Sequence, residues 1–290
     1  MTNSRMRRAV SDLMASYARA PDHPCKIRII HTLLKIFLKG GALVQRNGTV
    51  LIVDPTDFIG WEIFKTGEYE PYTASLVLNI LRNTSNCFID VGANIGLYSV
   101  AACSFPTVRC VAIEPDPINF RRLQENIAVN GFANIEICNF ALAGEPRPVR
   151  LEQPIKGNRG TVRVAAEMAR WTSTHERYSA ALTFDSLAKN LGIEDVELMK
   201  IDVEGFELDV LEGLDFGKPY RPKNIILEFT DYGERFGSHR GGRAVIYSFL
   251  SSRGYKAFDV FSTPISDADE PRESNAWFRD IYNGSPPLTT

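Results

Sequence analysis

The stretch from Asn86 to Gly96 constrains the fold more than any other part of the chain. A short apolar run ends on Asp90, and Gly92 and Gly96 follow at a D-x-G-x-x-x-G spacing before a helical pattern begins. Glycine tolerates positive φ and has no side chain, so backbone in this turn can approach a ligand closely. Backbone N–H groups at the helix start add a polar wall. The sequence therefore predicts a buried strand, a tight glycine turn and a helix that together form a ligand site.

A second apolar run, Val108–Ile113, also ends on an acid, Glu114. Glu114 lies 18 residues after Gly96. This interval is close to the roughly 20 residues after which the next strand of a Rossmann-like unit presents an acid to ribose hydroxyls. The dinucleotide fingerprint G-x-G-x-x-G is absent, which disfavours a nicotinamide or flavin cofactor. The two motifs together resemble the S-adenosylmethionine site of class I methyltransferases.

Composition narrows the class of protein. A chain of 290 residues can bury a full core, and a net charge of −2 argues against a broad surface for nucleic acid. The five cysteines include no C-x-x-C pair, which favours a reducing compartment and disfavours a structural zinc site. No run approaches the roughly 18 apolar residues of a membrane span, and no secretory signal pattern follows the first arginines. We therefore expect a cytoplasmic protein.

The chain is expected to consist of three segments. Residues 1–57 are predicted to form an N-terminal extension of two helices and a β-hairpin whose turn is Asn47-Gly48. This extension is interpreted as a packed cap or as an element of a homodimer, with binding to a membrane surface or another partner as the alternative. Residues 58–262 are predicted to form the class I methyltransferase domain. Residues 263–290 are expected to be a fraying tail.

Apolar strands alternate with amphipathic helices through most of the second segment. This pattern predicts an α/β fold, a Rossmann-like doubly wound sheet that is mostly parallel, with helices on both faces. Ligands bind such sheets outside the carboxyl ends of the strands, where Asp90, Glu114 and Asn139 all lie. An insertion at Glu145–Thr183 breaks the alternation. Within it, Arg170–Ser179 is polar and is either a substrate-facing loop or an ordinary surface insertion.

Polar residues also occur in a strand that should be buried on both faces. Lys200 and Asp202 are two apart, so they project from the same face of this strand, and Glu204 follows at its end. Central parallel strands are normally apolar, and an unpaired buried charge costs several kcal/mol. Lys200 and Asp202 therefore pair with each other or serve a ligand site at the edge that holds Asp90 and Glu114.

Three motifs together resemble the FkbM family of S-adenosylmethionine-dependent methyltransferases. They are Asp90-Val-Gly-Ala-Asn-Ile-Gly96, Glu114-Pro115 and Lys200-Ile-Asp-Val-Glu-Gly-Phe-Glu207. Supporting matches occur in the expected order between Phe58 and Val260, at Gly67-Glu-Tyr-Glu70, Asn139-Phe-Ala141, Thr183-Phe-Asp185, Val210-Leu-Glu-Gly213 and Ile226-Leu-Glu-Phe229. The combination is more specific than any single loop. A mild departure is Phe184, where the family more often has Leu.

The resemblance implies transfer of a methyl group to a hydroxyl of a sugar, a glycan or lipid headgroup, or a natural product. It implies a seven-stranded sheet whose last strands pair antiparallel. It also implies the cofactor residues: Asp90, Gly92, Asn94 and Gly96 around the methionine part of S-adenosylmethionine, Glu114 at the ribose hydroxyls, and Asn139 and Ala141 near the adenine.

An aliphatic hydroxyl is a poor nucleophile until its proton is taken, so a positioned base is expected. Asp202 is the first candidate and Glu204 the second, with Lys200 orienting them or lowering their pKa values. His175 and His239 lie in polar loops and are alternative bases, although a lone loop histidine is more often simply solvated.

Glu228, at the end of the next strand, is a candidate for positioning the substrate. A metal site is not expected. Asp202, Glu204, Glu228 and Asp231 offer oxygen ligands suited to Mg²⁺, but the ammonium of Lys200 beside them would repel a cation.

Other functions remain as alternatives. One is a non-catalytic protein that binds S-adenosylmethionine as a scaffold, and another is an N-methyltransferase of a small molecule. Methylation of nucleic-acid amino groups is disfavoured, because Asn/Asp-Pro-Pro-Tyr/Phe is absent from the end of the fourth strand. An NAD-dependent sugar-modifying enzyme is disfavoured by the missing glycine.

Overall fold

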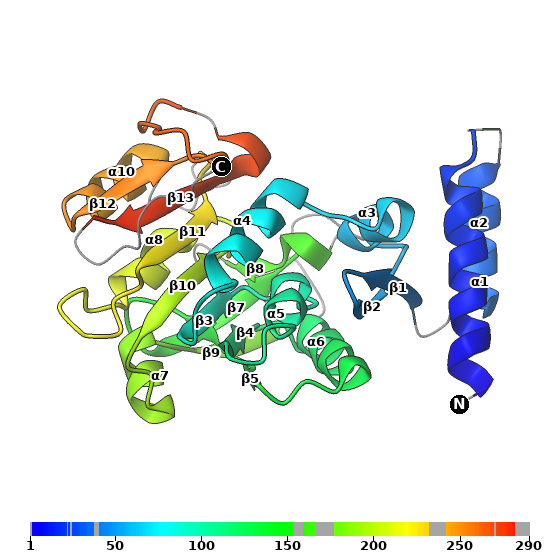
Figure 1. The fold of residues 1–290 in the computed structure, drawn as a ribbon, viewed down its shortest axis with the longest axis horizontal. Coiled ribbons are helices and arrows are strands. Elements are labelled where there is room, and N and C mark those ends of the chain that lie inside the picture. The colour runs from blue at the N-terminus through cyan, green and yellow to red at the C-terminus, as the bar shows by residue number, and fades with distance from the viewer. Residues whose placement is uncertain are drawn as a thin grey trace.

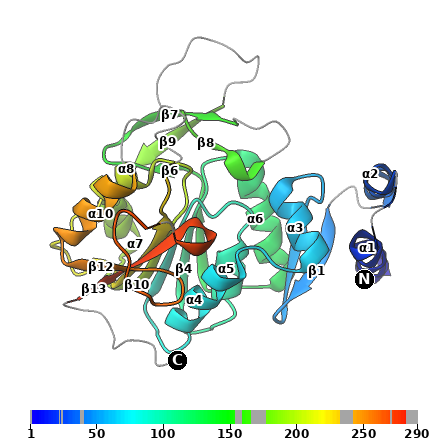
Figure 2. The same ribbon diagram turned by 90° about the horizontal axis from the view of Figure 1, so that it is seen from above.

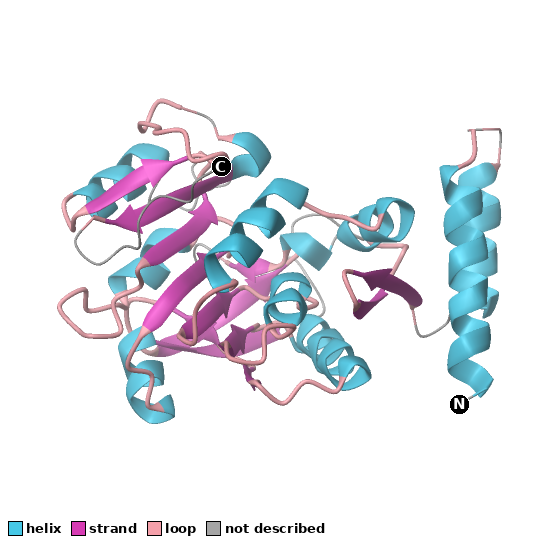
Figure 3. Cartoon of the chain, viewed as in Figure 1, coloured by secondary structure: helices cyan, strands magenta, loops and turns pink. Residues whose placement is uncertain are grey.

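The computed structural model describes residues 2–21, 23, 25–37, 41–153, 159–165, 177–231, 242–269 and 271–281. Its centre is a seven-stranded sheet with the strand order β12-β13-β11-β10-β3-β4-β5 (Figure 1). The strands are β3 (Cys87–Val91), β4 (Arg109–Ile113), β5 (Ile135–Cys138), β10 (Val196–Ile201), β11 (Asn224–Glu228), β12 (Tyr255–Phe258) and β13 (Asn275–Asp280). Figure 3 shows these strands enclosed by helices, which confirms the predicted α/β class.

The strand directions confirm the predicted mostly parallel sheet whose last strands pair antiparallel. The five strands from β5 to β11 run parallel to their neighbours, whereas β13 pairs antiparallel with both β11 and β12. The carboxyl ends of β3, β4, β10 and β11 therefore meet at one edge of the sheet. Since β13 is antiparallel, its first residue lies at that same edge, where Asn275 is opposite Glu228.

The prediction of a fraying tail from residue 263 is wrong for Asn275–Asp280, because these residues form β13 inside the sheet. Ala276, Trp277 and Phe278 are buried, and the indole N–H of Trp277 donates to Oδ1 of Asn224 at 3.0 Å. This strand is stabilised by pairing with residues about 50 positions earlier in the chain. Residues 282–290 lie outside the described part of the chain.

Each face of the sheet carries its own hydrophobic core. Phe88, Leu198 and Trp277 belong to one core, whereas their neighbours Met199 and Phe278 belong to the other. Figure 2 shows the helices on the two sides of the sheet. The first core is covered by α4 (Pro71–Leu81) and α5 (Leu97–Ala102), with α6 (Pro117–Asn130) beside them, and the second by α7 (Phe184–Leu191), α8 (Glu207–Glu212) and α10 (Arg243–Ser251).

The N-terminal extension contains α1 (Thr2–Arg19), α2 (Lys26–Phe37) and the predicted hairpin β1 (Ala42–Arg46) and β2 (Thr49–Val53), and α3 (Phe58–Thr66) follows it. Asn47 and Gly48 both have positive φ, 44° and 84°, as a tight two-residue hairpin turn requires.

The extension packs on the rest of the chain. Asn126 and Asn130 of α6 accept hydrogen bonds from the backbone N–H groups of Ile52 and Val50. Met14 of α1 belongs to the first core. A homodimer formed through α1 and α2 stays a prediction.

A smaller sheet has the order β6-β9-β7-β8, formed by β6 (Ala141–Leu142), β7 (Arg147–Glu152), β8 (Arg163–Val164) and β9 (Arg177–Leu182). Within the insertion that breaks the alternation, β7 and β8 pair antiparallel. The polar loop expected at Arg170–Ser179 ends earlier than predicted, because residues 177–179 belong to strand β9. Residues 170–176 of this predicted loop lie outside the described residues. None of the helices in the described ranges has the length and apolarity needed to cross a membrane.

Candidate active site

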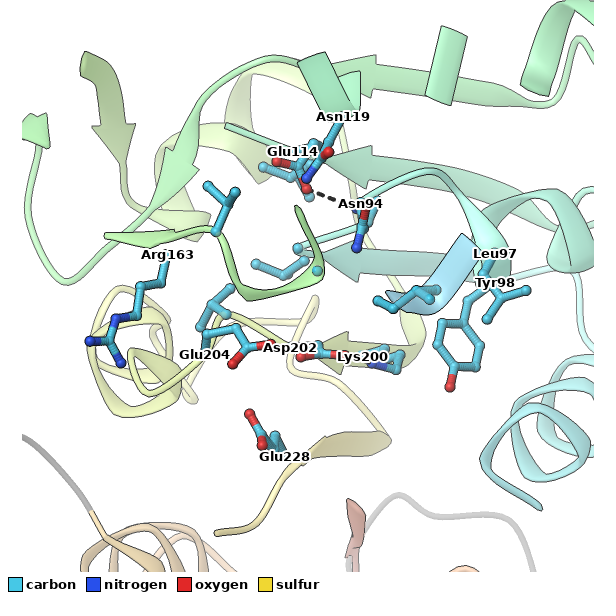
Figure 4. Close-up of a pocket in the computed structure, with 18 of the residues that line it drawn as sticks. Asn94, Leu97, Tyr98, Glu114, Asn119, Arg163, Lys200, Asp202, Glu204 and Glu228 are labelled. Atoms are coloured by element: carbon cyan, nitrogen blue, oxygen red, sulfur yellow. Dashed lines mark hydrogen bonds and ion pairs between the residues drawn. The ribbon is translucent and has the colours of Figure 1, made fainter. Parts of the chain in front are cut away.

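A cavity of about 240 Å³ lies at the carboxyl edge of the sheet (Figure 4). Eight of the predicted site residues line it: Gly92, Asn94, Glu114, Ala141, Lys200, Asp202, Glu204 and Glu228. They come from the ends of β3, β4, β10 and β11 and from the start of the smaller sheet. Segments far apart in the sequence therefore meet here, as the parallel topology requires.

Glu114 is fixed across the glycine turn. Its carboxylate accepts the backbone N–H of Asn94 at 2.8 Å and that of Asp116 at 2.7 Å. Burial raises the pKa of Glu114 to about 8, because the loss of hydration outweighs these two hydrogen bonds. Asn94, which makes the first of these bonds, takes a left-handed conformation with φ of 53°.

Gly92 is required by the close approach of two strand ends. A Cβ atom built on Gly92 would lie 1.8 Å from the carbonyl oxygen of Asp202, and the φ of Gly92 is 80°. Any other residue would push the end of β3 away from the end of β10. Gly96, by contrast, is absent from the cavity wall and begins α5 against the side chain of Leu123.

Two predicted cofactor residues support the cavity from behind. Asp90 is 2% exposed, and its Oδ2 accepts a hydrogen bond from the hydroxyl of Ser99 at 2.5 Å. The side-chain amide of Asn139 donates to the carbonyl oxygens of Glu114 and Pro115 and thereby fixes the end of β4. Neither side chain belongs to the cavity wall.

Lys200 and Asp202 form an ion pair, one of the two alternatives that their spacing allows. Nζ of Lys200 lies 2.8 Å from Oδ2 of Asp202 and 4.6 Å from the ring centroid of Tyr98. Lys200 is 1% exposed, whereas the side chain of Asp202 is 34% exposed. Burial alone would lower the pKa of Lys200, but the carboxylates of Asp202, Glu70 and Asp90 outweigh it and raise that pKa.

Glu70 is a member of the site to which the sequence assigned no role. The hydroxyl of Tyr98 donates to its Oε2 at 2.5 Å, and the amide of Asn275 donates to the same oxygen at 3.3 Å. Glu70 precedes α4 with φ of 46°. Its place in the motif Gly67-Glu-Tyr-Glu70 was the available signal, whereas Asn275 lies in the strand that the sequence did not reveal.

Glu204 and Glu228 lie beside Asp202 in the same part of the cavity (Figure 4). Burial, followed by the nearby charge of Asp202, raises the pKa of Glu204 to about 8 and that of Glu228 to about 9. Glu204 has φ of 57°, and Oε1 of Glu207 accepts the N–H groups of Val203 and Gly205 on either side of it. The loop that carries Glu204 is therefore held in a strained but well-bonded conformation.

Three groups of residues remain: the alternative bases, the possible metal ligands and the cavity residues that the sequence did not indicate. His175 and His239, the alternative bases, lie outside the described residues. Within the described ranges, no three His, Cys, Asp or Glu side chains are grouped in a way that could hold a metal ion. Further cavity residues that sequence reasoning missed are Tyr69, Tyr98, Asn119, Arg163, Glu273 and Ser274.

Comparison with known proteins places the chain in a family. Residues 90–257, more than half of the chain, match the model of the methyltransferase FkbM domain. Methyltransferase sdnD of Sordaria araneosa is 30% identical over 200 residues, which cover 59% of this chain and 74% of that protein. The hexuronic acid methyltransferase AglP of Haloferax volcanii is 32% identical over 127 residues, which cover 43% of this chain and 48% of that protein.

Among solved structures, M. jannaschii TYW2 in complex with AdoMet has 12% identity and a TM-score of 0.37, covering 83% of this chain and 86% of that one. The family match agrees with the prediction that S-adenosylmethionine is the cofactor. It also covers all three motifs that carried the resemblance. The chain belongs to the FkbM family of methyltransferases.

Proposed function

We propose that this methyltransferase transfers the methyl group of S-adenosylmethionine to a hydroxyl of a sugar, a glycan or lipid headgroup, or a natural product. The observation that carries the proposal is the Lys200–Asp202 ion pair, which lines the cavity next to the glycine turn of β3. A base is needed for a hydroxyl acceptor, and Asp202 is a half-buried carboxylate at the point where two strand ends meet.

The proposed cofactor site uses the turn after β3 and the end of β4. Gly92 and Asn94 would lie along the methionine part, with Asp90 and Gly96 supporting them. Glu114 would accept hydrogen bonds from the ribose hydroxyls, because each carboxylate oxygen keeps a lone pair beyond the one that a backbone N–H uses. Ala141 would lie beside the adenine, and Asn139 would hold the end of β4 near it. The acidic lining of the cavity suits a cationic cofactor.

S-adenosylmethionine supplies a methyl group that is already activated by its sulfonium. The protein then has to align the acceptor oxygen, exclude water and take one proton. Asp202 binds Lys200 through Oδ2, so Oδ1 is the oxygen proposed to receive the hydroxyl proton. Asp202 would take this proton as the acceptor oxygen gains the methyl group, and S-adenosylhomocysteine would be the second product. Glu204 is the second candidate for the base, and Glu228 is proposed to position the acceptor.

Calorimetric titration with S-adenosylhomocysteine tests the cofactor site. We expect binding to one site in the wild type and its loss in Glu114→Ala. The exposed acid Glu194, at the opposite end of β10, provides the control Glu194→Gln, which should bind normally. Failure of folded, ligand-free wild-type protein to bind S-adenosylhomocysteine would contradict the proposal and favour a scaffold role.

Turnover tests the chemistry. Neutral sugars, amino sugars and uronic acids should be incubated with S-adenosylmethionine, and the products analysed by mass spectrometry and NMR to locate the methyl group. Asp202→Asn should keep cofactor binding and lose turnover by about a hundredfold or more, the usual contribution of a general base. A product methylated on nitrogen would replace the O-methyltransferase assignment, and turnover of Asp202→Asn at the wild-type rate would refute the choice of base.

A further inference from the structure

One end of the cavity gathers four carboxyl groups and one carboxamide. We call it the acidic end and define it by five residues, Glu70, Asp202, Glu204, Glu228 and Asn275. It lies over β10, β11 and β13, on the far side of β10 from the strands β4 and β5. The glycine turn and Glu114 lie toward those latter strands, so the acidic end is the part of the cavity left for the methyl acceptor if the proposed cofactor site is correct.

Among the described residues, the two cations on the cavity wall are already engaged. Lys200 pairs with Asp202 at 2.8 Å, and Nε of Arg163 pairs at 2.9 Å with Glu152, which is not part of the wall. No cation of the described residues lies within ion-pair distance of Glu204 or Glu228. Burial, and after it the charge of Asp202, raises the pKa of both carboxyl groups. A ligand that enters here meets Glu204 and Glu228 without a cation of the described residues at ion-pair distance.

Asn275 adds an acceptor that is not a carboxylate. It is 2% exposed, and its Nδ2 donates to the carbonyl oxygen of Glu273 at 2.7 Å and to Oε2 of Glu70 at 3.3 Å. These two bonds fix the orientation of the amide, since a flipped amide would face oxygen with oxygen. Oδ1 of Asn275 accepts no hydrogen bond within the described part of the chain. A buried acceptor without a donor is rare in a folded protein and indicates a missing partner.

We propose that the methyl acceptor carries a protonated amine beside its hydroxyls, as an amino sugar or an aminocyclitol does, and that this ammonium binds at the acidic end between Glu204, Glu228 and Asn275. This inference rests on the proposed O-methyltransferase function and narrows its substrate class. An ammonium has three donors and no acceptor, which matches a wall rich in carboxyl oxygens. A neutral sugar would bring no counter-charge to Glu204 and Glu228, and a uronic acid would add another carboxylate to them.

The same arrangement selects the hydroxyl as the reacting group. Carboxylates around an amine favour its protonated form, which has no lone pair to attack the methyl carbon. The hydroxyl next to Asp202 keeps its lone pairs and can lose its proton to that carboxylate. The ammonium therefore serves as the anchor, and its proton count does not change during transfer.

The test compares acceptors whose ring hydroxyls are the same and whose amino group is charged, acetylated or replaced. The panel contains the methyl glycosides of glucosamine, N-acetylglucosamine, glucose and glucuronic acid, together with 2-deoxystreptamine and its N-acetylated form. Wild-type protein and S-adenosylmethionine are incubated with each compound, and kcat/KM is measured from the O-methylated product. Acetylation removes the charge while the ring hydroxyls stay in place, so each amine has its own matched control.

We expect the free amines to exceed their acetylated counterparts by about tenfold or more in kcat/KM, the value of one charge-assisted hydrogen bond. In Glu228→Gln this ratio should fall to within about threefold. The dissociation constant of S-adenosylhomocysteine should change less than the ratio, and Glu194→Gln should leave the ratio unchanged.

Four results would overturn the inference. They are equal or better turnover of the acetylated compounds, a preference for the glucuronide, a Glu228→Gln variant with an unchanged ratio, or no methylation of any amine by protein that binds S-adenosylhomocysteine. Failure to bind S-adenosylhomocysteine would instead refute the proposed function itself, so the two failures are distinguishable.

Discussion

Replacing Lys200 by Met would remove one buried positive charge and keep most of the side-chain volume. Lys200 is 1% exposed, and its ammonium lies 2.8 Å from Asp202 and 4.6 Å from the ring centroid of Tyr98. Glu70 and Asp90 also raise its pKa. The Lys200→Met variant would leave these three carboxylates without their shared counter-ion.

The expected loss of unfolding free energy is about 3 kcal/mol. Removing one partner of a buried ion pair costs about 3–5 kcal/mol, because the remaining charge is desolvated and unpaired. We take the lower end since the side chain of Asp202 is 34% exposed and can recover part of its hydration. A matched control is Lys218→Met, which breaks an exposed pair with Asp215 at 3.7 Å and should cost less than about 0.5 kcal/mol.

Equilibrium unfolding in urea measures both variants. A double-mutant cycle adds the Asp202→Asn variant and the double variant Lys200→Met/Asp202→Asn, in which neither charge of the pair remains. We expect a coupling energy of about 1–2 kcal/mol between the two positions, smaller than the full loss because Glu70 and Asp90 remain. A Lys200→Met variant within about 1 kcal/mol of the wild type, or additive effects in the cycle, would refute the view that one ammonium balances the buried carboxylates.

Three further outcomes can be checked. Glu114→Gln places a side-chain amide N–H against a backbone N–H, because both oxygens of Glu114 accept such groups. The affinity for S-adenosylhomocysteine, measured by calorimetry, should therefore fall by about tenfold or more. An unchanged affinity would contradict the assignment of Glu114 to the cofactor site. Gly92→Ala drives a Cβ to 1.8 Å from the carbonyl of Asp202 and should cost several kcal/mol in urea unfolding, whereas Gly131→Ala, with φ of 69° and open space, should cost only about 1 kcal/mol. The folded-state pKa of Glu228 is raised to about 9, above the unfolded value, so the folded protein holds this proton more tightly than the unfolded chain does. The stability that the protonated carboxyl group contributes is lost as the pH rises toward 9. The thermal midpoint of ligand-free protein should therefore decline from about pH 6 to about pH 9, and less steeply in Glu228→Gln; parallel curves would exclude this carboxyl group as a cause.

The sequence predicted those parts of the site that are encoded locally. Asp90, Glu114 and Asp202 each end an apolar run, and parallel topology brings such ends to one edge of a sheet. Period-two spacing places Lys200 and Asp202 on one face of β10 and leaves pairing or a ligand-site role as alternatives; in the structure they form an ion pair at the cavity wall.

The parts that sequence reasoning missed depend on contacts between distant segments. The strand Asn275–Asp280 is buried only because β11 and β12 pair with both of its edges, and no local pattern reveals that position. Asn275 and Glu70 are 205 residues apart and share a hydrogen bond at the cavity wall. Gly96 and Asn139, predicted from motif position to lie around the methionine part and near the adenine, are not part of the cavity wall, and they hold the helix start and the end of β4.

The contact between Gly92 and Asp202 links the proposed cofactor turn to the proposed base through backbone alone. The N–H of Asp202 donates to the carbonyl oxygen of Val91 at 3.0 Å, and the carbonyl of Asp202 occupies the space that a side chain on Gly92 would need. The distance between the turn and the Asp202 backbone is therefore set by strand pairing, which varies less than loop or side-chain packing. The glycine of the D-x-G-x-x-x-G motif thus serves two purposes in the proposed site, because the absence of a side chain lets the proposed cofactor turn form and also lets the strand end with the proposed base approach it.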